Sequence, residues 1–67
     1  MLEVKPRLTE ILKQRGITQS KLSEMTGVPQ SAISRFDRNT QHSDVHVFAI
    51  AKALGVNVEE LFEITGE

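Results

Sequence analysis

Polar and basic side chains cluster between apolar residues in the segment from Gln30 to Arg38. In a helix with 3.6 residues per turn, this cluster would lie on the face opposite Ile33 and Phe36. Glutamine can form two hydrogen bonds with adenine, arginine can bind guanine or phosphate, and serine can bind bases or phosphate. The pattern predicts a helix that contacts base edges through Gln30, Ser31, Ser34 and Arg35.

A second set of residues has the chemistry of phosphate contacts. A helix that begins after Thr18 would present its first backbone amides, together with the Gln19 side chain, to an anion. Arg38 suits phosphate better than a base. The residues predicted to contact phosphate are Thr18, Gln19, Lys21, Arg38 and Asn39.

These residues also have structural interpretations. Gln30 and the two serines could be exposed helix residues without a role, and Arg35 could pair with a neighbouring acid. Their position on one face favours binding for Gln30 and Arg35, whereas both interpretations stay open for Ser31 and Ser34.

Two short apolar patterns joined by Gly27 would position this surface. An apolar pair spaced three residues apart precedes the glycine, and a second pair with the same spacing follows it. Glycine suits a tight turn because a positive φ costs it little. We therefore expect a helix over residues 19–26, capped by Thr18, a turn, and a helix over residues 29–37 with Pro29 in its first position.

Three further helices are expected around this pair. An apolar stripe predicts a helix over residues 6–15, and residues 44–54, apolar around most of the circumference, predict a central buried helix. Asn57 and Glu60 have the spacing of a capping box and predict a helix over residues 58–64. No stretch is expected to alternate between apolar and polar residues with the period of two that is typical of a strand. The expected fold is all-α, a compact five-helix bundle forming one domain over residues 1–67.

Charge is distributed unevenly along the chain. Residues 5–38 carry seven Lys and Arg against three Asp and Glu, a net charge of +4, and the remaining residues carry one against six, a net charge of −5. A basic half can dock on phosphates while the acidic half stays in solvent. The chain has no cysteine and no apolar run of membrane-spanning or signal-peptide length, so we expect a cytoplasmic protein.

His42, Asp44 and His46 raise the alternative of a metal site, because histidines four residues apart can share a helix face. A helix boundary at Ser43 would break that spacing, so solvated polar residues are the preferred interpretation and no metal or cofactor is expected. Serine, histidine and aspartate are all present, but the chain has no nucleophile elbow and little room for a pocket. We therefore expect no enzymatic activity.

Several motifs, in order along the chain, resemble the lambda-repressor-like, Cro-type (XRE-like) helix-turn-helix family. They are Leu12-Lys-Gln-Arg-Gly-Ile-Thr-Gln19, Leu22 through Gly27-Val28, Ile33-Ser-Arg-Phe-Asp-Arg38, Ile50-Ala-Lys-Ala-Leu-Gly-Val56 and Glu60-Leu-Phe62. The resemblance covers about residues 7–62 and implies that Gln19 contacts phosphate while Gln30, Ser31, Ser34 and Arg35 read bases. Ser23 stands where the family usually has alanine, Pro29 where it often has serine, and the loop 39–43 lacks the usual glycine and proline.

The resemblance implies a bacterial or phage-type protein, associated with the nucleoid when bound to DNA. We expect a stand-alone transcriptional regulator, more a repressor than an activator, with no sensor domain and no small-molecule effector. It would bind an operator, an inverted repeat in double-stranded DNA, as a homodimer at least on DNA. The stripe Val58, Leu61, Phe62 and Ile64 is first a core seam and second a possible dimer face.

Two alternatives stay open at this stage. The first is a DNA-binding antitoxin or phage-type antagonist whose acidic and apolar C-terminal end binds a protein partner. The second is a protein-interaction module that has kept the fold and lost DNA binding, which only the net charge of −1 favours.

Overall fold

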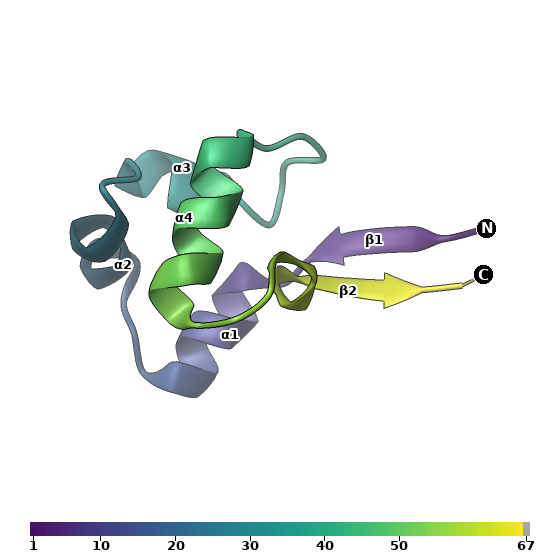
Figure 1. The fold of residues 1–67 in the computed structure, drawn as a ribbon, viewed down its shortest axis with the longest axis horizontal. Helices are drawn as coiled ribbons and strands as arrows, with labels where there is room; N and C mark the ends of the chain where they lie inside the picture. Colours follow the sequence, from purple (N-terminus) through teal and green to yellow (C-terminus); the bar gives the residue numbers. More distant parts are fainter. Residues whose placement is uncertain (67) are drawn as a thin grey trace.

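Four α-helices pack into a body from which the two ends of the chain leave side by side as paired strands (Figure 1). The computed structural model describes residues 1–66. Its elements are β1 (Glu3–Pro6), α1 (Leu8–Arg15), α2 (Gln19–Thr26), α3 (Gln30–Arg35), α4 (Asp44–Leu54), the 3-10 turn η1 (Val58–Leu61) and β2 (Phe62–Thr65). None of the helices in these 66 residues is long and apolar enough to cross a membrane.

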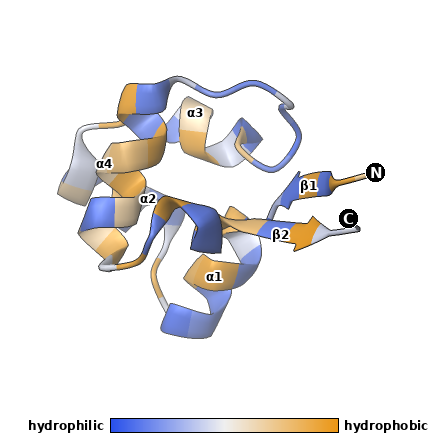
Figure 2. Ribbon diagram, turned by 45° about the vertical axis from the view of Figure 1, so that its right-hand side comes forward, coloured by the Kyte–Doolittle hydropathy of each residue, from blue (hydrophilic) through white to orange (hydrophobic). Residues whose placement is uncertain are grey.

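An apolar core joins the helical elements. The largest fully buried side chains come one from each of α1, α2, α3, α4 and η1, namely Leu8, Leu22, Ile33, Ile50 and Leu61. Burying a side chain of this size contributes about 1.5–3 kcal/mol relative to leaving it in water. Figure 2 shows hydrophobic and hydrophilic segments on the helices, and a hydrophilic loop between α3 and α4. Each helical element is therefore held by at least one branched apolar anchor.

The helices predicted at about residues 19–26 and 44–54 are present as α2 and α4. The Thr18 hydroxyl accepts a hydrogen bond from the Lys21 backbone N–H at 3.0 Å, which is the expected N-cap. The predicted helices over residues 6–15 and 29–37 are shorter in the structure, where α1 begins at Leu8 and α3 covers Gln30–Arg35. Pro29 is not the first helical residue as predicted, because its ψ of 138° is extended, and it occupies the N-cap position of α3. After α3 the chain makes a turn in which the backbone N–H groups of Arg38 and Asn39 both donate to the Arg35 carbonyl.

The all-α prediction is wrong at both ends of the chain. Residues 58–64 do not form a fifth helix, since η1 ends at Leu61 and the backbone of Phe62 is extended, with φ −129° and ψ 151°. Strand β2 instead pairs antiparallel with β1, and the register places Val4 opposite Ile64 and Lys5 opposite Glu63. Pro6 lies in β1 rather than in the first turn of α1.

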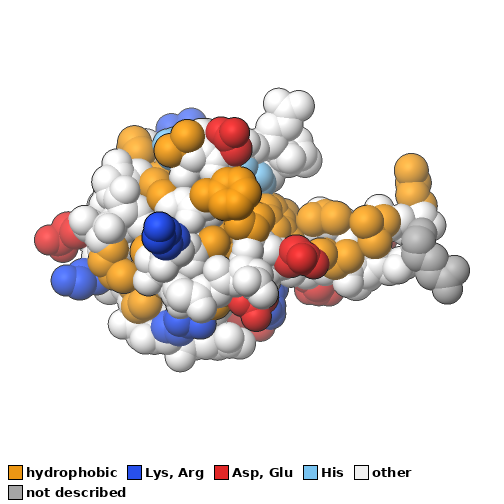
Figure 3. All heavy atoms as spheres, in the orientation of Figure 1, with side chains coloured by type: hydrophobic (Ala, Val, Ile, Leu, Met, Phe, Trp, Pro, Cys, Tyr) orange, Lys and Arg blue, Asp and Glu red, His pale blue; other side chains and the backbone are white. Residues whose placement is uncertain are grey.

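The N-terminal segment does alternate with a period of two, contrary to the prediction that no stretch does. Leu2, Val4 and Pro6 alternate with Glu3 and Lys5, which is the pattern of a strand with one apolar face. Hydrophobic side chains are visible along the paired strands in Figure 3. The alternation indicates a strand, but a strand of four residues is stable only when it pairs with another strand. Here the partner strand lies about 60 residues away in sequence, so the local pattern does not identify it.

Candidate nucleic-acid interface

The turn between α2 and α3 is held by three side-chain hydrogen bonds besides the backbone. Gly27 adopts φ +76°, and its N–H donates to the Ser23 carbonyl at 2.8 Å. The Ser23 hydroxyl donates to the Val28 carbonyl at 2.6 Å. The Thr26 hydroxyl donates to the Leu22 carbonyl at 2.7 Å and accepts from the Val28 N–H at 3.1 Å. These bonds fix the direction in which α3 leaves α2, and Ser23 contributes one that alanine could not make.

One face of α3 is anchored in the core and the opposite face is exposed. Ile33 and Phe36 are each 2% exposed, and Val28, just before the helix, is 3% exposed. The four residues predicted to contact bases are all exposed; they are Gln30, Ser31, Ser34 and Arg35. The structure thus separates the anchoring side chains from the polar ones, as helical periodicity required.

The residues predicted to contact phosphate lie at the N-terminus of α2 and just beyond the end of α3. Thr18, Lys21, Arg38 and Asn39 are exposed, and Gln19 is half-buried as the first residue of α2. The Thr18 hydroxyl already accepts a hydrogen bond as the cap of α2. Thr18 would therefore contribute to a phosphate site by fixing the N-terminus of α2. In the sequence, the first group precedes α3 and the second group follows it.

Asp37 has a role that the sequence did not indicate. Its two carboxylate oxygens accept hydrogen bonds from the backbone N–H groups of Leu8 and Thr9, at 2.7 and 2.9 Å. Helix α1 has no side-chain N-cap of its own, because Arg7 occupies that position. A carboxylate at a helix N-terminus is also favoured by the helix dipole.

This contact also affects the electrostatics of the exposed face. Asp37 is the single acid between Met25 and Ser43, and its charge is bound at the start of α1. The Asp37 carboxylate therefore does not form an ion pair with its neighbours Arg35 and Arg38. A charge count along the sequence could not reveal this arrangement.

Two arginines of the basic half are used in the fold. The Arg15 guanidinium donates to the Leu54 carbonyl at 2.8 Å, which closes the C-terminal end of α4. The Nε–H of Arg7 donates to the Glu60 carbonyl at 3.2 Å, and its backbone N–H donates to the Leu61 carbonyl at 2.9 Å. Part of the net charge of the basic half therefore stabilises the packing of the C-terminal segment.

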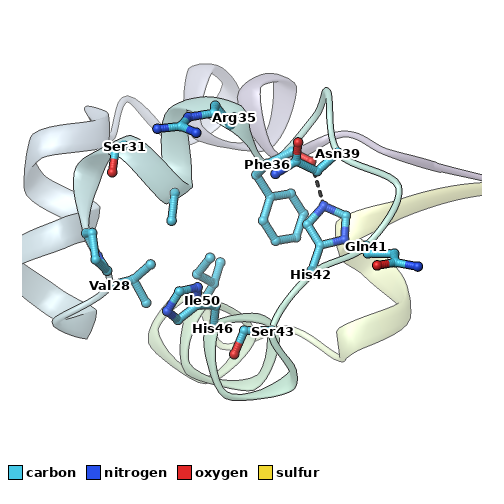
Figure 4. A pocket seen from close by; sticks show the side chains of 12 residues that line it. Val28, Ser31, Arg35, Phe36, Asn39, Gln41, His42, Ser43, His46 and Ile50 are labelled. Atoms are coloured by element: carbon cyan, nitrogen blue, oxygen red, sulfur yellow. Dashed lines mark hydrogen bonds between the residues drawn. The ribbon is translucent and has the colours of Figure 1, made fainter.

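A hollow of about 330 Å³ lies between α3 and the start of α4. Figure 4 shows Ser31 and Arg35 on the α3 side and Ser43 and His46 on the α4 side. The full lining comprises Val28, Pro29, Ser31, Ala32, Arg35, Phe36, Asn39, Gln41, His42, Ser43, His46 and Ile50. Gln41, Ser43 and His46 were not predicted as site residues, because a loop and a helix start give no periodic signal that would place them beside α3.

His42, which lines the hollow, also belongs to an aromatic cluster. Its Nε2 lies 2.6 Å from the Phe36 carbonyl, which can only accept, so Nε2 carries the hydrogen. Its ring lies over Phe36 with centroids 4.1 Å apart, and both rings are 5.9 Å from the ring of Phe62. Residues 1–66 contain no group of three or more His, Asp or Glu side chains placed to hold a metal ion.

The stripe considered as a dimer face does not form one surface. Leu61 is fully buried, and Val58 and Phe62 are partly buried against the core. Ile64 alone is exposed, at 45%, and it lies on β2 rather than on a helix. The four residues therefore do not share one helix face, because η1 ends at Leu61, and a dimer contact through them stays a prediction.

A comparison with known protein families matches residues 7–67 to the Cro/C1-type HTH DNA-binding domain. Comparisons with curated proteins and with solved structures gave no match. The matched span contains all four α-helices and the exposed face of α3, whereas β1 precedes it.

Proposed function

Because the chain belongs to the Cro/C1-type helix-turn-helix DNA-binding family, we propose that it is a sequence-specific regulator of transcription that binds double-stranded DNA. The observation that carries this proposal is the division of α3 into a buried face, anchored by Ile33 and Phe36, and an exposed face of polar and basic residues. Such a helix can enter the major groove without disturbing the core.

The dimensions of α3 suit the major groove. An α-helix with its side chains is about 10–12 Å across, which fits the roughly 12 Å width of the B-DNA major groove, and the six residues of α3 extend about 9 Å along the helix axis. Gln30 in the first turn and Arg35 in the last turn would reach different base pairs, with adenine and guanine as the bases they pair with best. Ser31 and Ser34, between them, would contact bases or phosphates.

Phosphate contacts would set the register of this helix. The N-terminus of α2 offers backbone N–H groups and the Gln19 side chain, and the turn after α3 offers Arg38 and Asn39. Lys21 would add charge on the first turn of α2. Contacts on both sides of α3 would hold it in the groove while Gln30 and Arg35 read the sequence.

The regulatory outcome proposed is repression of transcription by occupancy of an operator. An inverted repeat with half-sites about 34 Å apart, one helical turn of DNA, would be bound by two copies of the chain. Blocking access to DNA requires only a tight, specific complex, which a domain of this size can form.

The test is selection of bound duplexes from a random DNA pool at low and near-physiological salt, followed by sequencing. Enrichment of one motif that survives the higher salt supports sequence-specific binding, because nonspecific binding weakens steeply as salt rises. Binding without enrichment, or no binding, would contradict the proposal. The Arg35→Ala variant serves as the matched control, since it should change the enriched motif and not merely the yield.

A second candidate, an antitoxin or phage-type antagonist that acts through a protein partner, is favoured by one observation. Val45 and Phe48, three residues apart and therefore neighbours on α4, are 70% and 64% exposed and together form a small apolar surface. Native mass spectrometry of the full chain purified from its host distinguishes the two. A stoichiometric second protein that is lost in the Phe48→Ser variant would favour the antagonist.

A further inference from the structure

The side chain of His46, in the first turn of α4, is half-buried and lines the hollow beside α3. Figure 4 shows the imidazole of His46 on the α4 side of the hollow and the Arg35 side chain on the α3 side. Arg35 belongs to the exposed face of α3 that is proposed to enter the major groove. His46 therefore lies at the margin of the DNA-binding face, although it belongs to a different helix.

The His46 imidazole is not used by the fold in the way that the His42 imidazole is. The ring of His42 is hydrogen-bonded to the Phe36 carbonyl, and Figure 4 draws no such bond for His46. In the part of the chain that the structure describes, no buried side-chain nitrogen or oxygen lacks a partner, so the ring nitrogens of His46 reach solvent. The imidazole is thus available to a group from outside the chain.

Few charges surround this imidazole. The other ionisable side chains that line the hollow, among residues 1–66, are Arg35 and His42, and no charged side chain of α2 or η1 lines it. Asp44 lies two positions before His46, which is about 200° around the helix, and its carboxylate accepts from the Val45 N–H at 2.8 Å. No carboxylate of the described residues therefore lines the hollow as a counter-ion for a protonated His46.

We propose that His46 contacts a backbone phosphate of DNA in its protonated form, so that DNA binding takes up a proton and becomes tighter as the pH falls. A negative charge against an imidazole favours the charged form of the ring. An ordinary histidine titrates near pH 6.5, so the effect would fall within the range of pH in which cells live. The proposal rests on the proposed function, because it requires that α3 lies in the major groove.

The geometry favours a phosphate over a base as the partner of His46. A helix with its side chains fills the major groove, so an element that lies beside α3 meets the sugar-phosphate backbone that borders the groove. Ser43 precedes His46 by three residues and lines the same hollow. The Ser43 hydroxyl makes no cap hydrogen bond in α4, so it is available to donate to the same phosphate.

The direction and size of the pH effect follow from linkage. The complex binds the proton of His46 more tightly than the free chain does, so the affinity for DNA rises as the pH falls through the titration of the imidazole and levels off at high pH. A contact that favours the charged form by about one pH unit contributes at most about tenfold in affinity. We expect a dissociation constant about fivefold lower at pH 6 than at pH 8.

Fluorescence anisotropy of a labelled duplex, titrated with the full chain between pH 6 and pH 8 at constant ionic strength, tests the proposal. The His46→Gln variant should bind at the wild-type pH 8 level throughout, and His46→Arg, whose charge is permanent, should bind equally well at both pH values. The control variant His42→Gln, measured where it is folded, should keep the wild-type pH response. A wild type without a pH response, or an undiminished response in His46→Gln, would overturn the proposal.

NMR titration of the His46 ring protons observes the proton directly. The midpoint of this titration should rise by about one pH unit when the duplex is bound, and the midpoint of His42 should move less. The matched arm replaces the duplex with millimolar inorganic phosphate, which should leave the midpoint unchanged. An equal rise with inorganic phosphate would assign the site to a free anion and contradict a contact that depends on docked DNA.

The choice of duplex separates this proposal from the proposed function. A phosphate contact needs no base sequence, so a random-sequence duplex at low salt serves as well as a selected motif. If no motif is enriched but binding has a pH response that His46→Gln removes, sequence-specific regulation fails and the phosphate contact stands. If a motif is enriched and His46→Gln leaves the pH response unchanged, the contact fails and sequence-specific binding stands. Absence of binding to any duplex would refute both.

Discussion

Asp37 should be one of the most stabilising polar side chains in this chain, although its sequence position suggests only a surface acid. Its carboxylate accepts two backbone hydrogen bonds, from Leu8 at 2.7 Å and Thr9 at 2.9 Å. Helix α1 has no other side-chain cap. Removal of the carboxylate would therefore leave the first turn of α1 without its acceptors and would release the end of α3 from α1.

The magnitude follows from these two bonds. A hydrogen bond to a charged group contributes about 1.5–3 kcal/mol, and loss of an N-cap typically costs about 0.5–2 kcal/mol. Thr9 is exposed, so water can replace the carboxylate as the acceptor for the Thr9 backbone N–H. The hydrogen bond from the Leu8 N–H is partly buried, so its loss is less well compensated by water. We expect Asp37→Ala to lower the free energy of unfolding by about 2–3 kcal/mol. Asp37→Asn keeps one acceptor oxygen and should cost about 1 kcal/mol.

Urea unfolding of the full chain at pH 7, followed by circular dichroism, measures this effect. In a domain of this size, about 2–3 kcal/mol corresponds to a fall in Tm of about 10–20 °C. Glu10→Gln is the matched control, because Glu10 is an exposed acid in the first turn of α1 whose carboxylate accepts one long hydrogen bond, from Gln14 at 3.4 Å, so its loss should change stability by less than about 1 kcal/mol.

DNA affinity distinguishes the role of Asp37 as a cap from the role of an acid that repels DNA. If Asp37 were an unpaired acid beside the DNA, its removal would strengthen binding and leave stability unchanged. The structure predicts lower stability and no gain in affinity for Asp37→Asn at temperatures where the variant is folded. Tighter DNA binding with unchanged stability would refute the role of Asp37 as the cap of α1.

Four further substitutions test the site and the core. Gln30→Ala should cost about 1–3 kcal/mol at one base pair and relax the preference there, and equal loss on every duplex would rule out base reading. Arg38→Gln should weaken binding to all sequences alike and reduce the salt slope by about 1, which titrations at several salt concentrations measure; a change in the preferred sequence would contradict a phosphate contact. Leu61→Ala should cost about 2–5 kcal/mol in urea unfolding, whereas Ile64→Ala, examined at concentrations where the protein is monomeric, should cost less than about 1 kcal/mol. Similar losses for both would mean that β2 is as deeply packed as η1.

The accuracy of the sequence-based predictions varied with the range of the interactions involved. Helices α2 and α4 form where the sequence predicted them, because the Thr18 cap, the terminal glycines and the apolar spacing are all local signals. The predicted helix over residues 58–64 failed after Leu61, where pairing with β1 decides the backbone conformation. The predicted exposure of the polar face of α3 followed from periodicity alone, and its contacts with DNA stay predictions.

The sequence by itself determined the family, the helix-turn-helix and the residues that face away from the core on α3, since motif order and helical period are properties of the linear chain. Only the tertiary structure decided where individual charges are used. Asp37 caps a helix that begins 29 residues earlier, and Arg15 bonds to a carbonyl 39 residues later. The structure also decided that the two ends of the chain pair as antiparallel strands, because strand pairing and long-range capping depend on which segments the packed core brings together.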